Sequence, residues 1–198
     1  MWHTGDRVAP PFMDECLARH GFRTTEKLEV LAFLLVKGQE QRLPRIRVPE
    51  DLSVELVRDA EVLREALFVD SEVFRSPLPT GGEFAKYAGE LEKLLRHERG
   101  EHFRGGASLA ARFAAYVTSS ITSGAGSPRS IVAAATRQTF RGRGAYGALV
   151  LERCRVGTHL NATLALVKAN ISTSGAILKR AGFRPVGTER RHVLEIQR

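Results

Sequence analysis

The stretch S-I-V-A-A-A-T-R-Q-T-F-R-G-R-G-A-Y-G-A, Ser130 to Ala148, decides the fold of this chain. Its first half, Ile131 to Thr136, is apolar and β-branched, which predicts a buried strand. A cationic, glycine-rich turn follows at Arg141 to Gly144, and apolar residues then recur at helical spacing as far as Cys154. The stretch therefore predicts a strand, a glycine-rich turn and a helix in direct succession.

This succession presents backbone N–H groups at the start of a helix. Glycines let the main chain come close to a ligand, and the first-turn amides together with the helix dipole favour an anion such as phosphate. Arg141 and Arg143 add positive charge where a pyrophosphate would lie. A tight turn that binds nothing is the alternative. The P-loop pattern G-x-x-x-x-G-K-[ST] is absent from the sequence, so that nucleotide fingerprint does not explain the turn.

The turn resembles the acetyl-CoA loop of the GNAT superfamily of N-acetyltransferases, whose core pattern is [RQ]-x-x-G-x-[GA]. The pattern in this chain is Arg141-x-x-Gly144-x-Tyr146, an R-G-R-G-x-Y variant with tyrosine where a small residue is usual. A second resemblance lies downstream, where the apolar run Ala165 to Ala169 precedes a helix that ends in Gly182-Phe183. GNAT domains carry a similar strand, and a similar helix that ends in G-F, after the acetyl-CoA loop.

The expected elements follow the order of a GNAT domain over about residues 45 to 196. That order implies an α/β (α+β) GNAT fold: a mixed, mostly antiparallel sheet with helices on both faces and a splayed central strand pair. The expected helices are 60–74, 83–99, one that begins at Ala145 and one that ends at Gly182; the expected strands are 52–58, 110–118, 131–136, 163–169, 183–187 and 190–196, with a loop at 100–106.

Residues 1–44 are expected to form an N-terminal extension and linker before a GNAT domain at 45–198. The run Leu17 to Arg23 matches Leu178 to Arg184, and Gly21 and Gly182 stand 161 positions apart. Each glycine can take the left-handed conformation that ends a helix. Chance is one explanation of the match. Our preferred interpretation is a remnant of a preceding, mostly lost copy of the fold, packed on the main domain or on a second subunit.

Composition limits the class of protein. The 198 residues are 43% hydrophobic and 26% charged, as in an ordinary globular domain with a short appendage. A net charge of +8 favours an anionic partner, which a phosphate-rich co-substrate satisfies. Two cysteines exclude a disulfide framework, and the apolar run 30–36 is too short to cross a bilayer. We expect a cytoplasmic protein without a membrane partner, with a homodimer as a possible assembly.

The resemblance implies acetyl-CoA as co-substrate and direct transfer of its acetyl group to an amine of a small molecule or protein. Carried over by position, the backbone of the strand would bind the pantetheine arm and the turn would bind the pyrophosphate. An asparagine that often touches the cofactor maps to Ile171, and Asn170 stands beside that position. The cofactor-binding residues implied are Ala134, Ala135, Thr136, Arg141, Gly142, Arg143, Gly144, Ala145, Tyr146, Gly147 and Asn170.

Catalytic residues are harder to assign. The position of the tyrosine acid of many GNAT enzymes is Leu178, and the strand 131–136 carries no carboxylate to act as a base. Tyr146 and Glu72 are the candidates that remain; space filling and a plain surface carboxylate are their alternatives. The missing acid and base motivate a second hypothesis, an acyl-CoA-binding GNAT module with little or no turnover and a regulatory role.

Two other functions are not favoured. His97 and His102 are five residues apart with Gly100 between them, so they do not match a zinc motif, and no metal is expected. A single Arg-Gly-Arg-Gly inside a strand–helix context is not an RNA-binding RGG segment, so nucleic acid is an unlikely partner.

Overall fold

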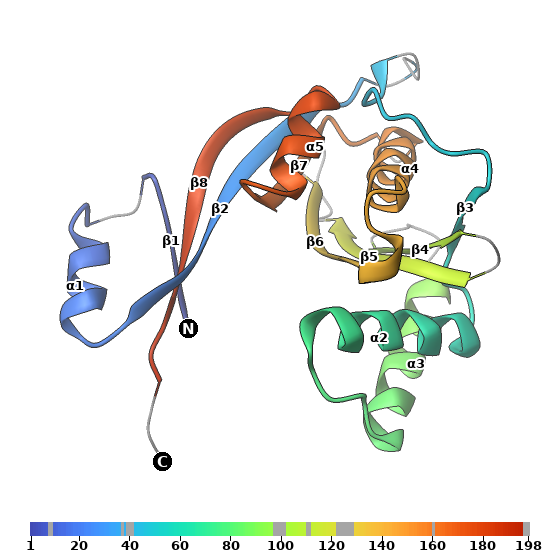
Figure 1. Cartoon of the computed structure of the whole chain (residues 1–198), viewed down its shortest axis with the longest axis horizontal. Helices are drawn as coiled ribbons and strands as arrows, with labels where there is room; N and C mark the ends of the chain where they lie inside the picture. Colours follow the sequence, from blue (N-terminus) through green and yellow to red (C-terminus); the bar gives the residue numbers. More distant parts are fainter. Residues whose placement is uncertain are drawn as a thin grey trace. The chain divides into compact units, whose positions relative to one another are not determined.

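A computed structural model describes residues 1–7, 10–36, 38, 42–96, 102–109, 112–121, 129–159 and 161–195. The chain forms two compact units (Figure 1). The first unit combines Met1–Phe33 with Leu166–Arg198, and the second unit is Leu34–Ala165. Within the described part of the chain, no helix is both long enough and apolar enough to cross a membrane.

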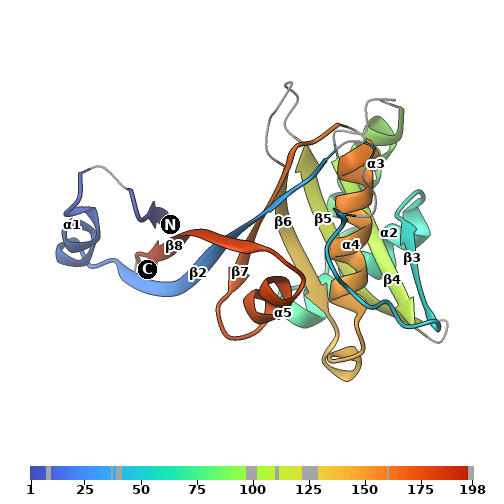
Figure 2. The same cartoon turned by 90° about the horizontal axis from the view of Figure 1, so that it is seen from above.

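The second unit contains an antiparallel sheet in the strand order β6-β5-β4-β3. Its strands are β3 Leu52–Leu56, β4 His102–Leu109, β5 Arg112–Ile121 and β6 Arg129–Thr136. Helices α2 (Ala60–Phe74) and α3 (Gly81–Arg96) lie on one face of this sheet and α4 (Ala145–His159) lies on the other (Figures 1 and 2). Antiparallel strands and helices on both faces confirm the expected fold class. The loop expected at 100–106 was wrong, because β4 begins at His102.

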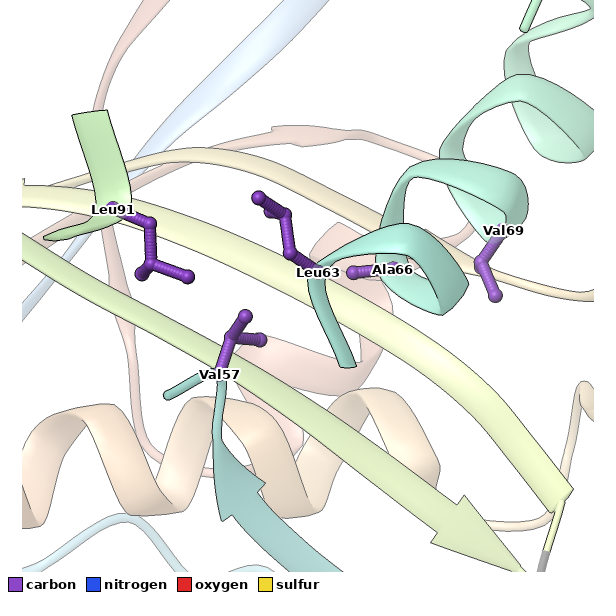
Figure 3. Close-up of a cluster of buried hydrophobic side chains, with 5 residues drawn as sticks. All are labelled: Val57, Leu63, Ala66, Val69 and Leu91. Atoms are coloured by element: carbon purple, nitrogen blue, oxygen red, sulfur yellow. The ribbon is translucent and has the colours of Figure 1, made fainter. Parts of the chain in front are cut away.

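Helix α2 begins and ends as its sequence dictates. The Asp59 carboxylate accepts hydrogen bonds from the backbone N–H groups of Glu61 and Val62, each at 2.9 Å, and so caps the first turn. Arg75 ends the helix in the left-handed conformation, with φ of +54°. Between these ends, buried side chains of α2 meet side chains from the end of β3 and from α3 (Figure 3). This core consists of Val57, Leu63, Ala66, Val69 and Leu91.

The first unit has the strand order β1-β8-β2-β7. Its elements are β1 Trp2–Gly5, α1 Met13–Arg19, β2 Arg23–Leu34, β7 Leu164–Asn170, α5 Ser174–Arg180 and β8 Arg184–Val193. Two final strands were expected at 183–187 and 190–196, but a single strand, β8, runs through both ranges. The position between β7 and β8 is filled by β2 instead. The N-terminal segment therefore supplies an inner strand, and β1 is a strand that the sequence analysis did not anticipate.

Two similar arms make up most of the first unit. The N-terminal arm is α1 with β2, and the C-terminal arm is α5 with β8 (Figure 1). The bounds of both helices and the starts of both strands are 161 positions apart. Each helix ends in a Schellman turn around a glycine with positive φ, +80° at Gly21 and +102° at Gly182. The matching bonds run from Phe22 N–H to Leu17 O at 2.9 Å and from Phe183 N–H to Leu178 O at 3.0 Å.

The antiparallel pairing of β2 with β8 follows the same offset. The ladder pairs Arg23 with Val193, Thr24 with His192, Glu26 with Arg191, Lys27 with Arg190, Leu28 with Glu189, Glu29 with Thr188, Val30 with Gly187, Leu31 with Pro185 and Ala32 with Arg184. Adding 161 to the β2 residue number of a pair and subtracting 161 from its β8 residue number gives another pair of the ladder. The pair Arg23–Val193, for example, gives the pair Arg184–Ala32. Leu28 and Glu189 lie at the centre of this symmetry. The two arms are thus related by an internal two-fold axis.

Candidate active site

The turn after β6 adopts the conformation that its glycines allow. Ala134, Ala135 and Thr136 are the last residues of β6 and pair with β5 along one edge. A short 3-10 turn, Gln138–Phe140, leads into the R-G-R-G loop. Gly142 has φ of +76° and Gly144 has φ of +85°, in the left-handed region that other residues rarely adopt. The predicted succession of strand, glycine-rich turn and helix is therefore present.

Helix α4 starts immediately after this loop. Its first backbone hydrogen bond within the helix runs from the Ala148 N–H to the Gly144 carbonyl, at 2.9 Å. The amides of Ala145 and Gly147 precede that bond, so they have no acceptor one helical turn back. Over 15 residues, α4 also has a full dipole with its positive end at the loop. These are the groups that an anionic ligand requires.

The three glycines of the loop differ in what surrounds them. A Cβ at Gly144 would lie 3.0 Å from Pro49 Cδ, and one at Gly147 would lie 2.9 Å from Ile46 Cγ2. These two glycines are needed because the preceding segment packs against the helix start. A Cβ at Gly142 would meet no described atom within 4 Å. Gly142 is therefore the glycine whose open face is available to a ligand.

The arginines of the loop point in different directions. The Arg141 Nε donates to the Thr136 carbonyl at 3.4 Å, which folds this side chain back along the end of β6. The Arg143 guanidinium lies 5.9 Å from the centre of the Phe140 ring. Both arginines are exposed, as binding of a soluble phosphate group requires.

Glu72 is held by a cation. Its Oε2 accepts a hydrogen bond from Arg137 Nε at 2.8 Å, and Arg137 also lies 5.4 Å from the centre of the Phe68 ring. Arg137 is the residue directly after β6, so this contact ties α2 to the end of the strand that carries the loop. The carboxylate of Glu72, a catalytic candidate from the sequence, has a structural partner in this position.

Tyr146 lies in the first turn of α4 and is partly buried. Two turns further along the helix, burial lowers the pKa of Arg153 to about 9, and the nearby Tyr146 hydroxyl opposes that shift. The neighbouring thiol of Cys154 is 1% exposed, and burial raises its pKa to about 12. Cys154 is therefore a buried apolar side chain, as the sequence predicted, and not a nucleophile.

The remaining predicted residues lie in the first unit. Asn170 ends β7, and its Oδ1 accepts hydrogen bonds from the Ser172 N–H at 3.1 Å and the Ser172 hydroxyl at 2.8 Å. The side-chain oxygen is thus engaged in an Asx turn that leads into α5. Leu178 is 0% exposed inside α5, so this position contributes packing and no acid.

The residues considered for zinc binding fall largely outside the described part of the chain. His97 is among them, and only the backbone of His102 is described. Among the described residues, no group of three or more histidine, cysteine or acidic side chains could hold a metal ion.

The run Gly142 to Gly147 also satisfies the letters G-x-G-x-x-G of dinucleotide-binding folds. That fingerprint has its meaning in a parallel βαβ unit. The strand before this loop, β6, is paired antiparallel with β5, so the strand context of a dinucleotide-binding fold is not met on that edge.

Asp70 is a polar residue that the sequence analysis missed. It is partly buried on α2, burial raises the pKa of its carboxyl, and it has no hydrogen-bond or ion-pair partner among the described residues. A signal was available: Asp70 follows Leu63 by seven positions and Ala66 by four, which places it on the buried face of the helix. An acidic residue in a core-facing position is unusual and points to a role beyond packing.

Comparison with solved structures identifies the fold. A GCN5-related N-acetyltransferase from Sphaerobacter thermophilus matches 96% of this chain and 58% of its own, with a TM-score of 0.69 and 17% identity. A tandem GNAT protein from the clavulanic acid biosynthesis pathway matches 95% of this chain and 61% of its own, with a TM-score of 0.61 and 18% identity. An aminoglycoside acetyltransferase from an uncultured soil metagenomic sample, in complex with sisomicin, matches 64% and 83%, with a TM-score of 0.51 and 16% identity.

The chain therefore has the GNAT fold, and spans about three fifths of the first two of these structures. No protein-family model matches the sequence, and no curated protein does.

Proposed function

We propose that this protein is an acetyl-CoA-dependent N-acetyltransferase that acts on an amine of a small molecule or protein. One observation carries the proposal: a Cβ at Gly142, in the R-G-R-G loop before the start of α4, would meet no described atom within 4 Å, so this glycine leaves room for an anion beside the first amides of the helix. Acetyl-CoA supplies a diphosphate for this site and a thioester for transfer. The neutral amine nitrogen would attack the thioester carbonyl to form a C–N bond, the C–S bond would break, the nitrogen would lose a proton, and the departing thiolate would take up a proton to become the free thiol.

The assignment of contacts follows the resemblance. The diphosphate would bind the amides from Gly142 to Gly147 with Arg141 and Arg143, and the pantetheine arm would bind the backbone of Ala134 to Thr136. Asn170 would contribute through its amide group, since its Oδ1 is engaged in the Asx turn. Tyr146 is the proposed acid, given its place at the loop and the leucine at position 178.

Calorimetry with a matched pair of variants tests the anion site. Gly142→Ala places a methyl group on the open face, and Gly38→Ala does the same at a glycine with φ of +72° and no described atom within 4 Å. Both variants carry the same backbone strain, so only the ligand distinguishes them. We expect acetyl-CoA affinity to fall at least tenfold in Gly142→Ala and to stay unchanged in Gly38→Ala. Equal acetyl-CoA affinities of the two variants would show that the R-G-R-G loop does not bind the co-substrate.

An acyl-CoA-binding module without turnover is the second candidate function. The fully buried Leu178 favours it, because the position used for the acid in many GNAT enzymes carries no ionisable group. Release of free CoA thiol in the presence of a panel of amines separates the two. Binding of acetyl-CoA without thiol release for any amine would favour the module.

We also propose that residues 1–44 descend from a preceding GNAT copy, joined to a GNAT domain at 45–198. The matching hydrogen bonds and the two-fold register of β2 and β8 support this origin. Free, unpaired cysteines at positions 16 and 154 fit a reducing compartment, so we place the protein in the cytoplasm. A homodimer stays a prediction, which light scattering during size-exclusion chromatography would check.

A further inference from the structure

Arg137 is anchored to helix α2 by two contacts. Its Nε donates to Glu72 Oε2 at 2.8 Å, and its guanidinium lies 5.4 Å from the centre of the Phe68 ring. Phe68 and Glu72 are four residues apart, so they are neighbours on one face of α2 and can contact the same arginine. Arg137 directly follows Thr136, the last residue of β6 that pairs with β5. Helix α2 therefore holds the backbone at the point where the pairing with β5 ends.

A short turn connects Arg137 to Arg141, the arginine of the R-G-R-G loop that the proposed diphosphate contacts require. The Phe140 N–H closes the turn by donating to the Arg137 carbonyl at 3.0 Å. The Arg141 side chain returns to the start of the turn, where its Nε donates to the Thr136 carbonyl at 3.4 Å. That carbonyl belongs to the peptide bond between Thr136 and Arg137. A displacement of Arg137 would therefore also move the acceptor that orients Arg141.

We propose that Glu72 is a positioning residue that acts through Arg137 on Arg141 and so sets the affinity for the diphosphate of acetyl-CoA. The inference rests on the proposed function and concerns how its diphosphate site is held. Arg141 is exposed, so a side chain without a fixed acceptor would lose much conformational freedom on binding a phosphate. An arginine already oriented at the end of β6 loses less of that freedom. Helix α2 thus contributes to co-substrate binding without touching the co-substrate.

A role in folding alone would have a different signature. The side chains of Arg137 and Glu72 are 25% and 43% exposed, and an ion pair with this exposure contributes little to stability. Removal of the Glu72 carboxylate should therefore leave the midpoint of thermal unfolding nearly unchanged. The main effect is expected on acetyl-CoA affinity, and only while Arg141 is present to be oriented.

A double-mutant cycle measured by calorimetry with acetyl-CoA tests the inference on the full chain. Acetyl-CoA affinity should fall about fivefold in Glu72→Ala and about tenfold or more in Arg141→Ala. In the Arg141→Ala background, Glu72→Ala should cause no further loss, because the side chain that it orients is gone. Glu65→Ala, which removes another exposed carboxylate from α2, is the matched control and should bind acetyl-CoA as the wild type does.

Glu72→Gln separates positioning from base catalysis. The amide oxygen of glutamine can still accept a hydrogen bond from Arg137 Nε, but the side chain cannot take a proton from an amine. We expect an acetyl-CoA affinity between those of the wild type and Glu72→Ala, with release of CoA thiol maintained in the presence of an accepted amine. Wild-type acetyl-CoA affinity in Glu72→Ala, together with loss of thiol release in Glu72→Gln, would make Glu72 a catalytic base and overturn the inference.

Two further outcomes would also overturn it. An equal loss of acetyl-CoA affinity from Glu72→Ala in both backgrounds would show that Glu72 acts independently of Arg141. Wild-type affinity in Arg141→Ala would show that Arg141 does not bind the co-substrate. In both cases acetyl-CoA still binds the wild type, so the proposed function is retained. If acetyl-CoA does not bind the wild type, the proposed function itself is lost, and the inference with it.

Discussion

The two arms of the first unit have the same helix–turn–strand arrangement but differ in the side chain in the first turn of the helix. In the N-terminal arm, the Asp14 carboxylate accepts hydrogen bonds from Thr4 Oγ1 at 2.6 Å and Arg190 Nε at 2.7 Å. The equivalent residue of the C-terminal arm is Gly175, where a Cβ would lie 2.9 Å from the Asn170 carbonyl oxygen. The first turn of α1 thus contains an internal ion pair, whereas α5 has no side chain at the equivalent position.

The two arms therefore use this position differently. An anionic group fixed at the start of α1 excludes an anionic ligand there and joins α1 to β1 and β8. The start of α5 instead presents Asn170, Ser172 and Thr173, all exposed. We infer that the N-terminal arm has a support role in the fold, which the contacts of Asp14 with β1 and β8 provide.

Deletion of residues 1–34 is the severest test of that support role. It removes β2 from between β8 and β7, together with Leu31, which is 0% exposed. Both neighbouring strands would lose a partner, so we expect no cooperative unfolding transition by circular dichroism. A truncated chain that still unfolds cooperatively near the wild-type temperature would show that the N-terminal arm is dispensable.

The next largest effect on stability is expected when the aspartate of the N-terminal arm is introduced at the equivalent position of the C-terminal arm. In Gly175→Asp the new side chain meets the Asn170 carbonyl and lies beside Glu29, whose Oε2 is 3.2 Å from the Cβ position. Like charge and steric conflict together should cost about 2–3 kcal/mol in the free energy of unfolding, measured in urea. Acetyl-CoA affinity should fall as well. Wild-type values for both quantities would mean that the two first turns are interchangeable.

The two glycines that end the helices should rank in a definite order. Gly182→Ala and Gly21→Ala both force alanine into positive φ, which costs about 1–2 kcal/mol. A Cβ would lie 3.4 Å from Phe33 Cε2 in the first case and 3.4 Å from Leu194 Cδ1 in the second. Phe33 packs against Phe183 with ring centres 5.1 Å apart and ring planes tilted by 42°, whereas Leu194 is 40% exposed and can move. Gly182→Ala should therefore destabilise more in urea unfolding; the reverse order would contradict the packing described.

The smallest effect is expected for Asp14→Asn. The Thr4 hydroxyl, and then Arg190, hold the pKa of Asp14 below its ordinary value. Since the folded state favours the ionised form, this stabilisation is complete above about pH 4 and disappears as the pH falls through the lowered pKa. Asp14→Asn should lose about 1 kcal/mol or less at neutral pH and show a shallower loss of stability in acid. Glu15→Gln, at an exposed site on α1, should keep the wild-type pH profile.

Local sequence patterns predicted local structure well. The capping residue Asp59 and the spacing of Leu63 and Ala66 located α2, and the glycines of the R-G-R-G loop located the start of α4. The echo between the two arms was visible in seven residues around Gly21 and Gly182. Each of these signals depends on residues within one or two turns of each other.

Features that depend on distant residues were not predictable in this way. No local pattern shows that β2 enters the sheet between β7 and β8, so a second C-terminal strand was expected in its place. Strand β4 was predicted as a loop because it contains Gly105 and Gly106, and glycine is uncommon inside strands. The need for glycine at positions 144 and 147 comes from contacts with Pro49 and Ile46, which lie 95 and 101 positions earlier in the sequence.

The pairing of β2 with β8 also sets the timing of folding. Arg184, at the start of β8, is synthesised 161 positions after Arg23, at the start of β2. During translation the 12 residues of β2 therefore cannot pair with β8 until the whole second unit has emerged from the ribosome, and their backbone groups lack that partner until then. A contact between such distant segments closes slowly, so we expect the apolar end of β2, Val30 to Leu34, to stay exposed in the nascent chain for a long interval.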